Sequence, residues 1–310
     1  MNMASETAPA RNGSLARAAI EAVRPKQWIK NLIVFAALIF GRHISDRSMV
    51  ETALVAFALF CLLSSSVYLI NDSLDARRDR QHPKKRFRPI ASGRLPVSYA
   101  VALAAILAVV GVGLSFWVNL GFGLLALTYL VLETSYSFFL KHIVIVDVMT
   151  IAIGFVLRAA GGGAAIGVVI SPWLLVCTIL LALFLALSKR RHELVLLEDN
   201  AQAHRRSLSE YTPYLLDQMI NVVTASTVVS YSLYTMSPET VEKFDTHALA
   251  YTIPFVIFGV FRYLYLVHQK GEGGDPERIP VTDKPFIINI ALWLATVAVV
   301  LYWQPRWLPG

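Results

Sequence analysis

Long apolar stretches separated by short polar ones run along the whole chain. The apolar windows are roughly 17 to 25 residues long, the length at which a helix crosses a lipid bilayer. They predict nine transmembrane helices, at 28–43, 49–71, 97–118, 121–138, 142–160, 170–188, 214–235, 247–267 and 285–304. The predicted fold class is therefore an all-α polytopic membrane protein, built as a single helix bundle without an internal repeat or a second domain.

Composition agrees with a membrane protein. The chain has 310 residues, of which 56% are hydrophobic and only 16% charged, and its mean hydropathy is +0.56. Soluble domains carry about a quarter charged residues. Residues 1–23 lack the apolar core of a signal peptide, so we expect a soluble N-terminal tail ahead of a transmembrane catalytic domain at 24–310. Both cysteines, Cys61 and Cys177, lie inside apolar windows and are expected to be small packing residues.

Basic residues are concentrated in alternate loops. The loops at 72–96 and 189–213 carry eight and five Lys or Arg, whereas the loops near 44–48 and 236–246 carry one each. Loops rich in Lys and Arg stay on the cytoplasmic side. We therefore predict a plasma (inner) membrane protein with its N-terminus and both basic loops in the cytoplasm and its C-terminus outside. The net charge of +7 follows from this orientation, so no nucleic-acid partner is inferred.

The densest block of charge is residues 71–94, NDSLDARRDRQHPKKRFRPIASGR. Its carboxylates, Asp72, Asp75 and Asp79, are three and four residues apart, which places them on one face of a helix within about two turns. Carboxylate oxygens are the ligands of hard divalent cations such as Mg²⁺. Eight Lys and Arg share this loop, so the block predicts a site for a magnesium-bound polyphosphate at the membrane surface.

Cations and polar residues elsewhere are candidates for the same surface. Lys30 and Asn31 enter the membrane with the first predicted helix, where a lysine that merely anchors the helix at the interface is the alternative. Lys141 closes the fourth predicted helix. At the end of the sixth, Lys189 and Glu193 lie one turn apart. That basic helix end either follows the charge rule alone or supplies cations to a second phosphate group.

Two charged residues lie inside the fifth predicted helix. Asp147 and Arg158 share one stripe, although about 16 Å of rise prevents a direct pair in a regular helix. Intramembrane charges usually face the interior of a bundle, so we expect a polar cavity there, with structural pairs to other helices as the alternative. The glycines at 161–163 are expected to stop this helix, because the sequence around them has neither the strand nor the GK[ST] of a phosphate loop.

Two motifs resemble a known family. The stretch NDSLDARRD at 71–79 resembles the first aspartate-rich motif, NDxxDxxxD, of the UbiA-type intramembrane prenyltransferase superfamily, and RPIASG at 88–93 resembles the segment that follows it there. The nine-helix pattern matches as well, and the resemblance covers most of residues 24–304. It implies a UbiA-like bundle with a metal-diphosphate site at its cytoplasmic end.

One departure from the usual UbiA pattern is informative. Typical members carry a second aspartate-rich motif at the end of the sixth helix, whereas this chain has SKRRHE at 188–193, with Glu193 as its only carboxylate. Direct Lys and Arg contacts suit a donor with more phosphate oxygens. Together with RPKQWIKN at 24–31 and YSFFLK at 136–141, this variant is similar to the decaprenyl-phosphate phosphoribosyltransferase branch.

That branch implies a donor, an acceptor and a cofactor. The donor is 5-phosphoribosyl diphosphate (PRPP), the acceptor is decaprenyl or another polyprenyl phosphate, and the product, decaprenyl-phosphoryl-5-phosphoribose, serves cell-wall arabinan synthesis. The implied catalytic residues and Mg²⁺ ligands are Asp72, Asp75 and Asp79. The expected substrate-binding residues are Lys30, Asn31, Asn71, Arg78, Arg88, Lys141, Lys189, Arg190, Arg191 and Glu193.

Two other functions stay open at this point. An aromatic prenyltransferase would use a prenyl diphosphate and an aromatic acceptor, and the absence of a second aspartate-rich motif argues against it. A lipid-phosphate transporter would share the helices and basic loops, but it has no need of three carboxylates on one helix face. The sequence leaves both the prenyl chain length and the formation of a homo-oligomer open.

Overall fold

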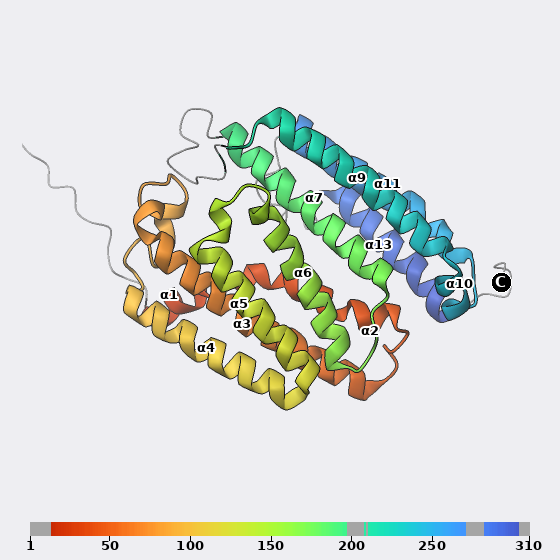
Figure 1. Ribbon diagram of the computed structural model, residues 1–310, viewed down its shortest axis with the longest axis horizontal. Helices are drawn as coiled ribbons and strands as arrows, with labels where there is room; N and C mark the ends of the chain where they lie inside the picture. The colour runs from red at the N-terminus through yellow and green to blue at the C-terminus, as the bar shows by residue number, and fades with distance from the viewer. Residues whose placement is uncertain (1–13, 197–207, 209, 271–281, 304–310) are drawn as a thin grey trace, which may run out of the picture.

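The computed structural model describes residues 14–196, 208, 210–270 and 282–303. In this part of the chain every regular element is a helix (Figure 1). The long helices are α3 (Arg47–Asp79), α4 (Val97–Val118), α5 (Leu120–Phe138), α6 (Val146–Ala165), α7 (Pro172–Leu196), α9 (Pro213–Met236), α11 (Ile253–Gln269) and α13 (Lys284–Ala298). The short ones are α1 (Leu15–Ala22), η1 (Pro25–Phe35), α2 (Ala36–Phe40), η2 (Lys85–Phe87), η3 (Leu140–His142), α10 (Pro238–Phe244), η5 (Ala248–Thr252) and η6 (Val299–Trp303).

Seven helical segments of the described residues are long and apolar enough to cross a membrane. They are Arg47–Asp79, Val97–Val118, Leu120–Phe138, Val146–Ala165, Pro172–Val195, Ala248–Gln269 and Lys284–Trp303. This is the pattern of a multi-pass membrane protein, as predicted. The predicted number of nine is not confirmed. The first predicted helix is the 3₁₀ helix η1 followed by five residues of α2, and α9 carries Asp217, Gln218 and Asn221 in its 24 residues, which lowers its hydropathy.

Several boundaries follow the sequence closely. The predicted helix at 97–118 is α4 without change, and the turn between α4 and α5 is a single residue, Asn119, whose side chain accepts from the backbone N–H of Phe122. The second predicted helix ends at 71, but α3 continues to Asp79. The acidic block is therefore helical to its last carboxylate, and Arg77 and Arg78 in the last turn complement the helix dipole.

The glycines at 161–163 do not end a helix, so the predicted stop is wrong. Helix α6 runs through them to Ala165. A Cβ on Gly162 would lie 2.0 Å from the carbonyl oxygen of Val34, and one on Gly161 would lie 2.7 Å from the ring of Phe60. Because glycine has no side chain, the backbone of η1 lies directly against α6. This contact seats the segment that carries Lys30 and Asn31 in the bundle.

Two of the apolar clusters among the described residues join six of the long helices. One joins α3, α5 and α6, with Phe60 edge-on to Phe122 and Tyr129 at centroid distances of 5.7 and 5.4 Å. The other joins α7, α9 and α11 around Phe184 and Tyr263. In a bilayer, close packing of this kind rather than removal from water holds helices together. Figure 1 shows the two groups of helices side by side, with α6 between them.

Candidate functional site

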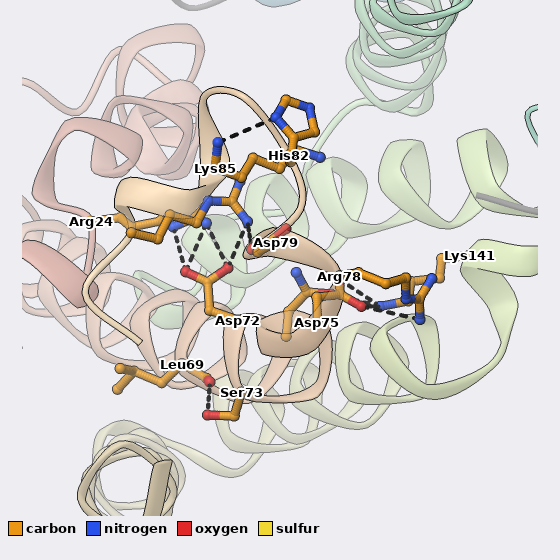
Figure 2. A network of polar contacts seen from close by, with 12 residues as sticks. Arg24, Leu69, Asp72, Ser73, Asp75, Arg78, Asp79, His82, Lys85 and Lys141 are labelled. Atoms are coloured by element: carbon orange, nitrogen blue, oxygen red, sulfur yellow. Dashed lines mark hydrogen bonds and ion pairs between the residues drawn. The ribbon is translucent and has the colours of Figure 1, made fainter. Parts of the chain in front are cut away.

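The aspartates of α3 lie in contact with cations from other segments (Figure 2). Arg24 binds Asp72 through Nη2 at 2.6 and 2.8 Å and through Nε at 3.2 Å. Arg88 donates from one atom, Nη1, to Asp72 at 3.1 Å and to Asp79 at 2.6 Å. Asp72 and Asp79 therefore converge on one nitrogen atom of Arg88.

Asp75 faces a different cation. The Nζ atom of Lys141 lies 2.9 Å from both carboxylate oxygens of Asp75 and donates to Oδ1 of Asn71 at 3.2 Å. Arg78, one turn further along α3, approaches Asp75 to 3.4 Å. Lys141 is only 2% exposed, so its charge depends on this partner. These contacts join α3 to η3 and place four of the predicted site residues together.

Local backbone structure explains how Arg24 and Arg88 reach α3. Arg24 lies between α1 and Pro25 with φ 55°, a left-handed conformation that turns the chain between the two helices, and its guanidinium lies 5.2 Å from the ring of Tyr68. After Arg88 the chain makes a compact turn in which Leu95 N donates to Pro89 O at 2.9 Å. Gly93 takes φ 78° there, a value that glycine adopts without strain.

The end of α7 forms a second polar cluster. Arg190 donates to Asp147 of α6 at 2.8 Å, to Glu193 at 2.6 Å and to the hydroxyl of Tyr136 on α5 at 3.1 Å. Its exposed fraction is 4% and that of Asp147 is 0%. Tyr211 completes the cluster, because its hydroxyl donates to Asp147 at 2.8 Å and accepts from Ile145 N at 2.7 Å. Burial raises the pKa of Tyr211, so the hydroxyl keeps its proton for this bond.

The other predicted residues lie around these two clusters. Arg191 pairs with Asp217 of α9. Lys189, two residues earlier on α7, is half-buried. Asn31 is fully buried and donates to Ser64 at 3.2 Å, while Lys30 is half-buried on η1. Arg190 and Glu193 are thus brought together, as are the aspartates with Arg88 and Lys141, whereas Arg191 faces a separate partner.

Sequence reasoning missed three contributors to these clusters. Arg24 stands at the head of RPKQWIKN and Tyr136 at the head of YSFFLK, so both motifs were noted without a role for these residues. Asp147 was recognised as an intramembrane charge, and it pairs with Arg190 of α7, as in the alternative of a structural pair with another helix. Nothing in the sequence around Tyr211 marks it as a partner of a residue 64 positions away.

The α3 cluster contains the donor atoms that Mg²⁺ prefers. Carboxylate oxygens of Asp72 and Asp79 converge on one cation, and Asp75 lies one turn from each along the helix. Here Arg88 and Lys141 hold the carboxylates, and among the described residues no set of three or more His, Cys, Asp and Glu is arranged around a common point for a metal. The three carboxylates are suitable ligands for Mg²⁺ once the ion displaces Arg88 and Lys141 from them.

A family model covers most of the chain. It is described as the UbiA prenyltransferase family and matches residues 32–290. The chain belongs to the UbiA prenyltransferase family. The family predicted from the two motifs is thus confirmed.

Among UbiA relatives, the chain is similar to proteins named decaprenyl-phosphate phosphoribosyltransferase. The protein from Corynebacterium glutamicum is 36% identical over 94% of this chain and 89% of its own length. The one from Mycolicibacterium smegmatis is also 36% identical, over 92% of each chain. The protein from Mycobacterium tuberculosis is 32% identical. The predicted resemblance to this branch is therefore confirmed.

Solved UbiA structures share the fold. A UbiA homolog from Archaeoglobus fulgidus bound to GPP and Mg²⁺ superposes with a TM-score of 0.71 at 19% identity, over 92% of this chain and 99% of that one. A UbiA homolog from Aeropyrum pernix gives a TM-score of 0.60 at 15% identity, over 91% of this chain and 98% of that one. At such identities the agreement is one of fold, and it confirms the UbiA-like helix bundle.

Proposed function

We propose that this UbiA-family chain transfers the 5-phosphoribosyl group of PRPP to decaprenyl phosphate or a similar polyprenyl phosphate, releasing diphosphate. The relatives named decaprenyl-phosphate phosphoribosyltransferase support the choice of substrates, because they match over nearly their whole length. The observation that carries the proposal is the contact of three aspartates with Arg24, Arg88 and Lys141. The aspartates can exchange these cations for a metal ion, and the cations can then hold phosphate oxygens.

The metal in this proposal is Mg²⁺, and Asp72, Asp75 and Asp79 would hold it. Magnesium keeps several waters and is often bound by only one or two carboxylates together with substrate phosphates, so not every aspartate needs to be a direct ligand. Bound there, Mg²⁺ supplies positive charge to the diphosphate leaving group. Asn71 supports the aspartates from the same helix.

The reaction needs no proton transfer to begin. An anionic oxygen of the acceptor phosphate forms a bond to C1 of the ribose, the bond between C1 and the diphosphate oxygen breaks, and the bonding electrons leave with diphosphate. The chain's own cations act on the charge that develops, because Lys141, Arg88 and Arg78 lie at the aspartate face. The reaction therefore does not require a histidine dyad as general base.

The remaining predicted residues would bind the other phosphates of the donor. Lys30 and Asn31 lie on η1, and Lys189, Arg190, Arg191 and Glu193 lie at the end of α7. Arg190 is a special case, because its charge is already balanced by Asp147 and Glu193. We assign it the role of holding Tyr136, Glu193 and Asp147 in place rather than direct contact with phosphate.

The proposal includes an orientation and a place in the cell. The ends of α3 and α7 carry the basic loops, so the positive-inside rule places both clusters at the cytoplasmic surface of the plasma membrane, with residues 1–23 on the same side. PRPP is a soluble, highly charged compound and would reach the site from the cytoplasm. The lipid acceptor would enter from the bilayer, and its product would feed cell-wall arabinan synthesis.

An assay with two substrate mixtures tests the proposal. In the first, purified chain is incubated with Mg²⁺, labelled PRPP and decaprenyl phosphate. In the second, a prenyl diphosphate and 4-hydroxybenzoate replace these two substrates. Label from PRPP is expected in the lipid fraction of the first mixture only, and only with the divalent cation present. Prenylation of the aromatic acid instead would replace this function with that of an aromatic prenyltransferase.

A further inference from the structure

A buried arginine lies below the aspartate site with most of its hydrogen-bonding capacity unused. Arg158 of α6 is 4% exposed, and its Nη2 donates to the hydroxyl of Tyr129 at 2.7 Å. Its Nε has no partner among the described residues. The guanidinium otherwise lies over the rings of Tyr129 and Phe155, at 4.6 and 5.1 Å. A guanidinium has five N–H donors, so this one is poorly satisfied for a buried charge.

The carboxylate near Arg158 does not neutralise it through a direct bond. Glu133, one turn from Tyr129 on α5, points at Gly154 of α6, where a Cβ would lie 2.3 Å from its Oε1 and 3.6 Å from Nη1 of Arg158. Within the described part of the chain no hydrogen bond or ion pair joins the two side chains. Arg158 is thus a buried charge without a direct counter-ion among the described residues.

These residues continue the aspartate site into the bundle. Tyr68 precedes Asp72 by one helical turn, about 6 Å along the axis of α3, and its ring lies against the Arg24 that binds Asp72. Phe60 lies two turns deeper along α3 than Tyr68, and Arg158 contacts Tyr129, which packs edge-on against Phe60. Arg158 therefore lies deeper in the bundle than the aspartates, next to an aromatic cluster.

Burial of this charge needs a reason. A charged side chain in the middle of a membrane helix is costly even on insertion scales, and such residues usually mark a substrate path. Packing alone would be served better by an apolar residue of similar volume. An apolar ligand gains nothing from an unsatisfied guanidinium, whereas an anion gains charge-assisted hydrogen bonds.

We propose that Arg158 binds the phosphate of the polyprenyl phosphate acceptor. This inference rests on the function proposed above and deepens it by locating the second substrate. In a displacement at C1, the entering oxygen and the leaving diphosphate lie on opposite sides of the carbon. With the diphosphate at the aspartates, the acceptor phosphate lies on the side of the ribose that faces the bundle interior. Arg158 is a buried cation on that side of the aspartates.

The test is a binding experiment that does not involve PRPP. Full-length chain in lipid nanodiscs is titrated with decaprenyl phosphate and, separately, with the uncharged alcohol decaprenol. The wild type is expected to prefer the phosphate. Arg158→Gln is expected to weaken phosphate-lipid binding by about 10-fold or more, the worth of one charge-assisted hydrogen bond, and to leave alcohol binding unchanged. Arg262→Gln on α11, whose partner Asp283 lies at the start of α13, is the matched control and should bind like the wild type.

The outcomes separate a binding role from a structural one. Equal loss of phosphate and alcohol binding in Arg158→Gln would show a role in folding only, and wild-type affinity for the phosphate would overturn the proposal. If Arg158→Gln does not yield monodisperse protein, Arg158→Lys keeps the charge but lacks Nε, and its phosphate affinity must fall in the same direction; unchanged affinity would overturn the proposal as well. A wild type that binds the phosphate through Arg158 but transfers nothing from PRPP would leave this inference intact and refute the donor.

Discussion

The ends of α3 and α7 both form ion pairs with other segments, but the helix supplies the carboxylates at α3 and the cations at α7. On α3 one helix supplies the carboxylates, and the cations come from other segments, as Arg24, Arg88 and Lys141. On α7 one helix supplies the cations, and the carboxylates come from α6 and α9, as Asp147 and Asp217. Each helix end therefore takes most of its opposite charges from neighbouring segments, although Arg78 on α3 and Glu193 on α7 also pair within their own helices.

Exposure separates the two ends. The side chains of Arg24 and Arg88 are 24% and 26% exposed, whereas those of Arg190 and Asp147 are 4% and 0% exposed. Breaking a buried pair leaves an uncompensated charge, but partners that reach water can separate at little cost. We infer that Asp72 and Asp79 can exchange Arg24 and Arg88 for ligand, whereas the buried Arg190 pair of α7 is permanent. Lys141, whose side chain is 3% exposed, resembles Arg190 in its burial. The following predictions test this contrast.

The largest effect is expected on α3. Asp75→Asn removes the charge that faces Lys141 while keeping its shape, and it should lower the rate of phosphoribosyl transfer by about 100-fold or more, as the loss of an electrostatic group at the reacting centre does. Transfer by purified protein at saturating Mg²⁺ is the measurement. Glu51→Gln is the matched control, because Glu51 lies near the start of the same helix and is 62% exposed. Full activity in Asp75→Asn would remove the aspartates from the site.

The second effect concerns stability rather than rate. Asp147→Asn leaves the buried Arg190 without one of its two carboxylates, and the cost of such a change is about 3 kcal/mol or more. The melting temperature of the protein in detergent should fall by several degrees, with the KM for PRPP nearly unchanged in the protein that stays folded. An unchanged melting temperature with a raised KM would instead make Arg190 a phosphate ligand.

A smaller effect is expected at Arg191. Its pair with Asp217 is 20% and 32% exposed, so a double-mutant cycle of Arg191→Gln and Asp217→Asn should give a coupling of about 0.5 to 1 kcal/mol. Because Asp217 already satisfies Arg191, this change should raise the KM for PRPP less than Lys141→Gln does. The reverse order of the two KM values would place Arg191 at the donor.

The smallest effect belongs to the surface pair of Glu21 and Arg94. The hydrogen bond from Arg94 lowers the pKa of Glu21 in the folded protein. A lowered folded-state pKa stabilises above the unfolded value near 4.3, and the stabilisation is lost as the pH falls through the folded-state pKa. Both side chains are more than a third exposed, so the contribution is at most a few tenths of a kcal/mol. Melting temperatures of Glu21→Gln and the wild type should converge when measured towards pH 3, and a difference that grows with acid would contradict the assignment.

Sequence reasoning predicted the helices best where the pattern is purely local. An apolar window bounded by Pro96 and Asn119 gives α4 without error, because helix length and caps are set by neighbouring residues. It failed at η1, where the tight 3₁₀ segment depends on contact with α6, and at the glycines of α6, which serve that same contact. The shared face of Asp72, Asp75 and Asp79 could be predicted for the same reason, because helical periodicity alone places residues three and four apart on one side.

The ion-pair partners of the site residues could not be predicted from local sequence patterns. Arg88 lies 16 residues from Asp72 and Lys141 lies 66 residues from Asp75, so their contacts depend on how the helices pack. The basic run at 189–191 predicted a cationic surface, but the neighbours Asp147 and Asp217 decide how much of that charge is left for a ligand. Charge in a sequence is therefore a poor guide to free charge in a bundle.

The glycines of α6 limit how this chain can vary. Any substitution of Gly162 adds at least a Cβ atom, which would lie 2.0 Å from the carbonyl oxygen of Val34. The same helix carries Asp147 at one end and Arg158 in its middle, so a shift of α6 away from η1 would move both clusters together. Variation that alters substrate choice is therefore expected in side chains around the aspartates and Arg158, such as Tyr68 and Glu133, while the glycine contact between α6 and η1 stays unchanged.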